Sequence, residues 1–272
     1  MKILFYCPFK FNLKSKNLDK LGGIETLNIE LAIKLSSFNH EIYLATHSEN
    51  TIKKNKIYNI PIKELFYENH NFDLIISSNN SKIFNHFKNS RKILWLHNTL
   101  AIEKAIRRGF LLPIIFNKVN AIFVSKYLNI NTSFFYLFNK RKVLPNFLPA
   151  KFERVKKNYD REKIFVWSVQ REKGLQQVLN LWSEKIFNKS NDIKLYIYGI
   201  KKKNFRNKLK YYQKKNIFFF DKMSKQKLKN IYNKSLAMIC LGYDETFCLN
   251  ALEANACGLP ILTFGKTALY DF

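Results

Sequence analysis

The sequence has few cysteines, and it has no Asp-x-Asp motif. Its four cysteines show no C-x-x-C spacing and all lie in or beside apolar runs, at Cys7, Cys240, Cys248 and Cys257. This pattern is typical of small buried side chains in a reduced, cytoplasmic protein, and it excludes a disulfide framework or a zinc cluster. We therefore expect no metal cofactor.

Long apolar runs are also missing. No run approaches the roughly 18 apolar residues of a membrane-spanning helix, and "MKILFYC" (1–7) is too abrupt and too short for a signal peptide. Any membrane contact would be peripheral. Two short apolar stretches, "GFLLPIIF" (109–116) and "FFYLF" (134–138), are candidates for that contact, although buried helix packing is the favoured alternative.

Acidic residues are scarce, with 20 against 47 basic ones and a net charge of +27. Such a charge favours anionic partners, namely nucleic acid, an anionic membrane or a polyphosphate. However, 39 of the basic residues are Lys, in a chain rich in Asn, Ile, Phe and Tyr, which is typical of an AT-rich genome. Residues 1–148 carry a net charge of +13 and residues 149–272 carry +14, so no single domain holds the charge. A solvated basic surface and a real preference for anions both stay open.

Short apolar runs alternate with segments of helical period in both halves. Because the runs are continuous rather than alternating, we expect strands buried on both faces, and hence a parallel sheet covered by helices. We predict an α/β fold of two doubly wound, Rossmann-like domains, 1–148 and 149–272, with a ligand in the cleft between them. Strands are predicted at 2–7, 41–46, 72–77, 92–97, 121–125, 164–169, 193–199, 216–220, 236–242 and 260–264.

Two loops have the composition of anion sites. Gly22 and Gly23 stand at a predicted helix start after the first strand, where backbone amides and the helix dipole favour a phosphate. Arg171 and Lys173 precede the helix that Gly174 opens, and two cations beside a helix start suit a diphosphate. An ordinary tight loop and solvated loop charges are the respective alternatives.

The stretch "YDETFCLNALEANACGLPI" (243–261) places Glu245 and Glu253 eight residues apart. We expect a helix over 246–257, which separates the two carboxylates by about 12 Å along its axis. Each carboxylate can accept two hydroxyl hydrogen bonds, so the pair could hold vicinal diols at both ends of an extended ligand. The amides of Thr246, Phe247 and Cys248 could bind a phosphate between them. Alternatively, the helix is simply core; but a buried, unpaired Glu253 would then be costly.

"ETFCLNALEANACGLPI" (245–261) closely resembles the E-x7-E segment of retaining glycosyltransferases of the GT-B fold, family GT4. Further segments follow in that family's order: Gly22-Gly23 with Glu25, "VLPNF" (143–147), "REKGL" (171–175), "LYIYG" (195–199) and 216–247. The sequence departs from the family pattern at Trp167-Ser168, Cys248 and Asn255, and the family's closing C-terminal helix is absent. We therefore expect a C-terminally truncated donor-binding domain.

The resemblance implies a role for each candidate residue. Glu253 would bind the ribose and Glu245 the transferred sugar, while Arg171 and Lys173 would bind the diphosphate. Gly22 and Gly23 would approach the phosphates from the first, acceptor-side domain. His97 matches a position where many members place a polar residue near the sugar C1, although a core or loop histidine is equally compatible. Thr246, Phe247, Cys248 and Leu249 complete the predicted donor-binding segment.

The predicted function is transfer of a hexose-type sugar from a nucleoside-diphosphate sugar to a glycan or lipid-linked acceptor in bacterial surface glycan synthesis. The protein would be cytoplasmic, at the inner face of the membrane if it contacts anionic lipid. Two other classes stay open: a degenerate or truncated transferase that binds nucleotide without turnover, and a non-catalytic, basic nucleic-acid-binding protein. Against the nucleic-acid-binding alternative, the sequence contains no recognisable nucleic-acid-binding motif.

Overall fold

The structure is a computed structural model that describes residues 1–11, 13–14, 18–67, 70–155, 159–167, 174–200, 202–242 and 244–271. The chain divides into two compact units, Met1–Phe147 and Leu148–Phe272. This division falls one residue before the boundary expected from the sequence. Within the described residues, no helix is both long enough and apolar enough to span a bilayer.

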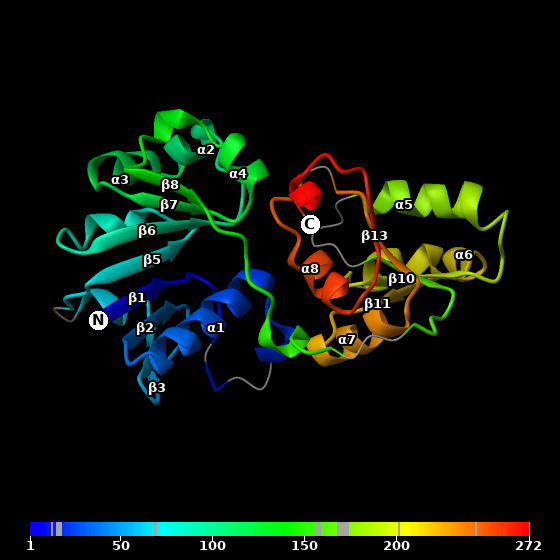
Figure 1. Ribbon diagram of the computed structural model, residues 1–272, viewed down its shortest axis with the longest axis horizontal. Coiled ribbons are helices and arrows are strands. Elements are labelled where there is room, and N and C mark those ends of the chain that lie inside the picture. Colours follow the sequence, from blue (N-terminus) through cyan, green and yellow to red (C-terminus); the bar gives the residue numbers. More distant parts are fainter. Residues whose placement is uncertain are drawn as a thin grey trace. The chain divides into compact units, whose positions relative to one another are not determined.

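Unit 1 is built on an eight-stranded sheet of order β3-β4-β2-β1-β5-β6-β7-β8, in which every neighbouring pair is parallel except β3–β4. Its central strands are continuous apolar runs that are buried on both faces, as expected for a helix-covered parallel sheet (Figure 1). The strands are β1 (Lys2–Tyr6), β2 (Glu41–Thr46), β3 (Ile52–Lys54), β4 (Ile57–Pro61), β5 (Leu74–Ser78), β6 (Arg91–Leu96), β7 (Asn120–Phe123) and β8 (Lys140–Val143).

The described residues of unit 1 form the α-helices α1 (Gly23–Ser37), α2 (Ile102–Arg107), α3 (Leu111–Phe116) and α4 (Lys126–Ile130). Short 3-10 helices in the same part of the chain connect the larger elements: η1 (Leu18–Lys20), η2 (Glu64–Phe66), η3 (Lys82–Asn85) and η4 (Phe134–Tyr136). The sequence did not predict strands β3, β4 and β8. Both β3 and β8 are edge strands, and their largely exposed, lysine-rich sequences "IKK" and "KRKV" lack the apolar run of a central strand.

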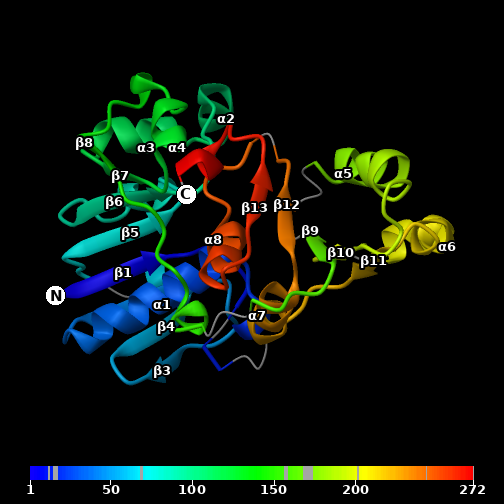
Figure 2. The same ribbon diagram turned by 45° about the vertical axis from the view of Figure 1, so that its right-hand side comes forward.

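Unit 2 has a five-stranded, fully parallel sheet of order β11-β10-β9-β12-β13. Its strands are β9 (Ile164–Trp167), β10 (Lys194–Tyr198), β11 (Ile217–Phe220), β12 (Ala237–Cys240) and β13 (Ile261–Thr263). Its α-helices are α5 (Leu175–Leu181), α6 (Leu209–Gln213), α7 (Lys225–Lys234) and α8 (Leu249–Ala256), shown from a second side in Figure 2. Shorter helical segments are η5 (Ala150–Phe152), the π-helical η7 (Trp182–Ile186), η8 (Lys202–Lys208) and η9 (Ala268–Asp271).

Each sheet contains a point where the strand order reverses direction. In unit 1 this point lies between β1 and β5, and in unit 2 it lies between β9 and β12. In open α/β sheets, ligands bind beyond the carboxyl ends of the strands at such points. The fold therefore directs attention to Cys7 and Asn79 in unit 1, and to the segment after Cys240 in unit 2.

Candidate functional site

Helix α8 begins at Leu249, three residues later than the sequence predicted. Glu245, Thr246 and Phe247 form a non-helical lead, so the predicted helix start at 246 is wrong and the rise of a helix cannot be used to estimate the separation of the two glutamates. The first turn of the helix is closed on the carbonyl of Cys248, which accepts hydrogen bonds from the amides of Ala251 and Leu252. Only Glu253 of the predicted pair is a helical residue.

Glu253 is fully buried in the middle of α8. Its Oε1 accepts a charge-assisted hydrogen bond from Lys225 Nζ at 2.5 Å, and only 12% of the Lys225 side chain is exposed. Lys225 is the first residue of α7, whose start is capped by the Ser224 hydroxyl. The structure thus supplies a protein partner for the carboxylate, which the sequence led us to consider unpaired.

Glu245 lies over the loop that follows β12. It is 9% exposed, and a Cβ added to Gly242 would lie 3.1 Å from its Oε1. A second glycine makes the same region compact, because a Cβ added to Gly174 would lie 2.7 Å from the carbonyl oxygen of Leu241. Gly174 has φ of +72°, which only glycine adopts readily. The two glycines let the start of α5, the loop after β12 and the Glu245 carboxylate pack together at the strand-order reversal.

Cys248 precedes α8 in a left-handed conformation, with φ of +60°. Its thiol is hydrogen-bonded to that of Cys240 at the end of β12; this bond, burial and the charge of Glu245 raise the pKa of Cys248 well above its usual value. The thiol is therefore neutral at physiological pH. A neutral thiol at this helix start adds no negative charge that would repel an anionic ligand.

A hollow of about 200 Å³ opens at the carboxyl ends of β12 and β13. Its lining includes Gly242, Thr263 and Lys266. The segment that follows Lys266 is bonded to the non-helical residues Glu245, Thr246 and Phe247, which we call the glutamate loop. The amide of Ala268 donates a hydrogen bond to the backbone carbonyl of Glu245 at 3.1 Å. Lys266 places an exposed cation beside this hollow and was not predicted as a site residue.

The remaining predicted residues of unit 2 divide into two groups. Phe247 is 7% exposed, and Thr246 and Leu249 are half-buried beside the glutamate loop. Arg171 and Lys173, the predicted diphosphate cations, lie outside the described residues.

In unit 1, Gly22 and Gly23 do stand at a helix start, with Gly22 as the residue before α1. However, a Cβ added to Gly22 would lie 2.5 Å from Oε2 of Glu25, so the side chain of Glu25 folds back over the first turn. Together with burial, the charge of Glu25 raises the pKa of Cys7 at the end of β1. The negative group beside this helix start is therefore a carboxylate of the protein itself.

His97 follows β6 and is 6% exposed. Its ring packs against Trp95 with 4.5 Å between ring centroids, and its backbone amide donates to Oδ1 of Asn79 at 2.8 Å. Burial lowers the pKa of His97 to about 3. The imidazole is therefore neutral near pH 7, and it can serve a ligand as a hydrogen-bonding group but not as a cation.

The carboxyl edge of unit 1 is otherwise lined by neutral polar side chains. Asn28 of α1 and Ser78 of β5 exchange hydrogen bonds of 2.9 and 3.1 Å, and both are buried. Within the ranges that the structure describes, no group of three or more His, Cys, Asp or Glu side chains has an arrangement that could hold a metal ion.

Residues 149–268, nearly all of unit 2, match the family described as glycosyl transferases group 1. This match identifies the chain as a glycosyltransferase, and the glutamate loop and α8 lie within the matched residues. No curated relative matches the sequence.

Solved structures share the fold of this glycosyltransferase over most of its length. The structure of WaaG, described as a glycosyltransferase involved in lipopolysaccharide biosynthesis, is 12% identical with a TM-score of 0.70, covering 98% of this chain and 82% of WaaG. Sucrose-phosphate synthase from Thermosynechococcus elongatus is 15% identical with a TM-score of 0.69, covering 96% and 80%. The catalytic domain of starch synthase IV from Arabidopsis thaliana, bound to ADP and acarbose, is 9% identical with a TM-score of 0.65, covering 99% and 84%. The GT-B fold is thus confirmed.

Sequence reasoning missed Lys225, Lys266, Gly174 as a contact residue and Gly242. Both glycines follow a strand or open a helix, which is where close backbone approach is common, so their positions offered a usable indication. Lys225 offered none, because it is one of 39 lysines and its pairing with Glu253 depends on how α7 packs beside α8.

Proposed function

We propose that this glycosyltransferase moves a hexose-type sugar from a nucleoside-diphosphate sugar to an acceptor hydroxyl, with retention of configuration at C1, as in family GT4. The observation that carries the proposal is the position of two buried carboxylates, Glu245 and Glu253, beside the strand-order reversal of the unit that matches the family. Buried carboxylates at a ligand edge suit the binding of hydroxyl-rich ligands, because each can accept two hydroxyl hydrogen bonds.

In this proposal Glu253 binds the ribose of the donor. Lys225 favours the ionised form of Glu253 and fixes its orientation through the bond to Oε1. Glu245, held over Gly242, binds hydroxyls of the transferred sugar. The start of α8 at Cys248 and Leu249 then approaches the diphosphate.

The reaction itself depends mainly on stabilising the leaving group. As the glycosidic bond to the diphosphate breaks, positive charge develops at the sugar C1 and negative charge grows on the departing phosphate oxygens. Preorganised cations lower this barrier, and we assign that role to Arg171 and Lys173, with Lys266, beside the hollow at the carboxyl ends of β12 and β13, as a further cation. Gly22 and Gly23 would contribute backbone amides, and neutral His97 would serve as a hydrogen-bonding group near C1.

The acceptor is proposed to be a bacterial surface glycan or its lipid-linked precursor. In support, WaaG is described as acting in lipopolysaccharide biosynthesis. A cytoplasmic protein with such an acceptor would work at the inner face of the membrane. Transfer is proposed to need no metal, because the sequence lacks Asp-x-Asp; full activity in EDTA is expected, and loss of activity there would contradict this point.

Nucleotide binding tests the assignment of Glu253. Thermal unfolding would be followed with UDP, GDP, ADP and CMP at about 100 times Kd, where stabilisation reaches about 2.7 kcal/mol. We expect one diphosphate to stabilise the wild type, and Glu253→Gln to lose most of that stabilisation. Exposed Glu184→Gln in the same unit is the matched control. Equal stabilisation of both variants would overturn the role of Glu253.

Turnover tests the remaining roles with the donor that this panel identifies. The double variant Arg171→Ala, Lys173→Ala should lose several kcal/mol of transition-state stabilisation, because charge-assisted bonds to a diphosphate are strong. Glu245→Gln should lower kcat while nucleotide binding is kept. Normal turnover in the double variant would contradict the leaving-group role, and an inverted anomer in the product would contradict retention. Nucleotide binding without any product would favour a non-catalytic protein.

A further inference from the structure

The amino edge of the unit 1 sheet gathers three chain segments that are distant from the proposed donor site. Because β5 to β8 are parallel, the residues before β6, β7 and β8 lie at one edge. Side-chain hydrogen bonds join these segments: Asn117 donates to Asn85 at 2.9 Å, and Asn139 donates to Asn120 at 2.8 Å. These hydrogen bonds connect the three segments at this edge.

A shallow hollow of about 730 Å³ lies on this edge, and its lining is basic. Lys88, Arg91 and Lys118 are exposed there. Lys92 lies beneath them and donates to the carbonyls of Lys88 and Ser90, which fixes the turn before β6. None of the described residues that line the hollow is acidic.

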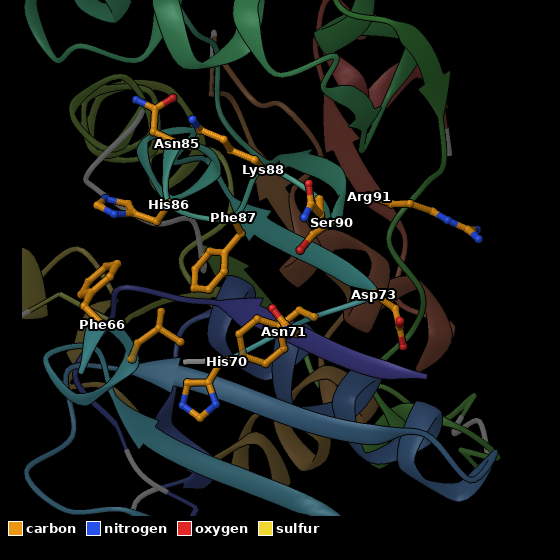
Figure 3. Close-up of a pocket in the computed structure, with 13 residues that line it drawn as sticks. Phe66, His70, Asn71, Asp73, Asn85, His86, Phe87, Lys88, Ser90 and Arg91 are labelled. Atoms are coloured by element: carbon orange, nitrogen blue, oxygen red, sulfur yellow. The ribbon is translucent and has the colours of Figure 1, made fainter. Parts of the chain in front are cut away.

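A neighbouring hollow of about 800 Å³ shares Lys88 and Arg91 with the first and is drawn in Figure 3. It contains the carboxylate of Asp73, whose Oδ2 accepts a hydrogen bond from the backbone amide of Lys2 at 2.7 Å. The Arg91 side chain extends away from Phe66 and Phe87 in this view. The Arg91 guanidinium is therefore directed away from these two rings.

Large apolar side chains border the basic hollow and are exposed to solvent. Phe116, at the end of α3, lines the hollow and is 77% exposed. Helix α3 lies beside η4, where Phe134 and Phe135 are 79% and 78% exposed. Leu137 follows at 65% exposed, in a left-handed conformation with φ of +48°. The sequence favoured interior packing for the "GFLLPIIF" and "FFYLF" stretches; Ile114 and Tyr136 are buried as expected, whereas these side chains are not.

The exposed aromatic residues are held on a fixed element. The Arg141 guanidinium lies over the Phe134 ring at 4.5 Å and donates to the carbonyls of Asn129, Thr132 and Ser133. This clamp fixes the segment that leads into β8. A fixed, exposed apolar rim requires less ordering on binding than a mobile loop does.

We propose that this edge, formed by Lys88, Arg91, Phe116, Lys118, Phe134 and Leu137, is a docking surface for an anionic lipid membrane. Its apolar rim enters the acyl boundary while the cations bind lipid phosphates, the combination that anchors peripheral proteins. A second copy of the chain is disfavoured as the occupant, because it would bring like charge to a basic surface. An anionic lipid membrane offers acyl chains to the apolar side chains and phosphates to the cations of this surface.

Vesicle co-sedimentation tests the proposal with the intact protein and without any donor or acceptor, so it is independent of the proposed reaction. We expect binding to phosphatidylcholine vesicles that contain 30% phosphatidylglycerol and little binding to pure phosphatidylcholine. Lys88→Gln with Lys118→Gln should weaken binding about fivefold for each lysine removed. The matched control, Lys208→Gln with Lys214→Gln, removes two exposed lysines from unit 2 and should keep wild-type binding. An equal loss of vesicle binding in both double variants would show that binding depends on the net charge of the protein, and it would overturn the proposed surface.

A fluorescence measurement tests the apolar rim separately. All three tryptophans, Trp95, Trp167 and Trp182, are buried, so a tryptophan introduced by Phe116→Trp reports on its own surroundings. Its emission should shift to the blue with anionic vesicles. That of Tyr211→Trp, at a 54% exposed control position, should not. No shift at position 116, or displacement of the vesicles by polyuridylate at equal charge, would overturn a lipid surface; displacement would instead favour nucleic acid.

Discussion

The two units carry the same kind of parallel sheet but bury different chemistry at its carboxyl edge. In unit 1 the buried groups there are neutral: Asn28 and Ser78 bond to each other, and His97 is held uncharged. In unit 2 the corresponding edge holds the carboxylates of Glu245 and Glu253, the latter paired with Lys225. These neutral groups need no ionic partner near pH 7, whereas each member of a buried ion pair depends on the other. Unit 2 therefore couples its stability to the groups proposed to bind the donor.

The largest expected effect tests the charged half of this comparison. Lys225→Met leaves Glu253 buried without its cation, and removing one partner of a buried pair typically costs about 3–5 kcal/mol. Urea unfolding followed by the fluorescence of Trp167 and Trp182 would measure the loss. Adding Glu253→Leu should restore most of the stability, since the charge is then gone. A single-variant loss below about 1 kcal/mol would show that solvent screens the pair and would break the contrast between the units.

The pH dependence of unfolding tests the neutral half. Burial lowers the pKa of His97 to about 3 from an ordinary value near 6.5, so between these pH values the unfolded chain binds a proton that the folded chain does not. Stability from this site is complete above about pH 6.5 and falls as the pH decreases, by about 2 kcal/mol at pH 5. His97→Phe should lack this loss while keeping the contact with Trp95; exposed His47→Gln is the control. An unchanged slope in His97→Phe would show that the imidazole titrates normally.

The smallest expected effect compares the two helix starts. Gly22 precedes α1 with an extended φ of −71°, whereas Cys248 precedes α8 with φ of +60°, a conformation in which a side chain is strained. Cys248→Gly should therefore be about 1 kcal/mol more stable than Cys248→Ala, which loses the thiol but keeps the strain. Chemical denaturation of the two variants measures this difference. Equal stabilities would mean that the loop relaxes, and that both helix starts are unstrained.

Sequence patterns predicted the repeating architecture because central strands must be continuous apolar runs, as in "KILFY" and "AMIC". Edge strands were not predicted because they need no apolar run. Strand β8, "KRKV", pairs with one neighbour at the edge of the sheet, and its side chains are exposed or half-buried. The start of α8 was misplaced because periodicity locates apolar faces, while the end of a helix depends on backbone conformation. The left-handed Cys248 has no counterpart in the residue pattern.

The sequence could predict which residues of the candidate site are present and in what order they occur along the chain. The spacing of Glu245 and Glu253 placed the candidate site in a loop and a helix that lie within the residues matching the family. The partners of these residues were not predictable, because the bond from Lys225 crosses from α7 to α8 and Glu25 returns to its own helix start. Contacts of this kind depend on side-chain positions in the folded unit, which neither spacing nor composition specifies.

Strand β6 has a further consequence for the acceptor. Arg91, at its first residue, belongs to the proposed lipid surface, and His97, just past its last, belongs to the proposed reaction edge. At about 3.3 Å per residue, a strand of this length holds the two edges roughly 17 Å or more apart. With this surface on the bilayer and β6 along the bilayer normal, a sugar attached directly to a lipid headgroup would lie short of the reaction edge. The sheet would thus act as a spacer that selects acceptors whose glycan has already been extended by earlier transfers.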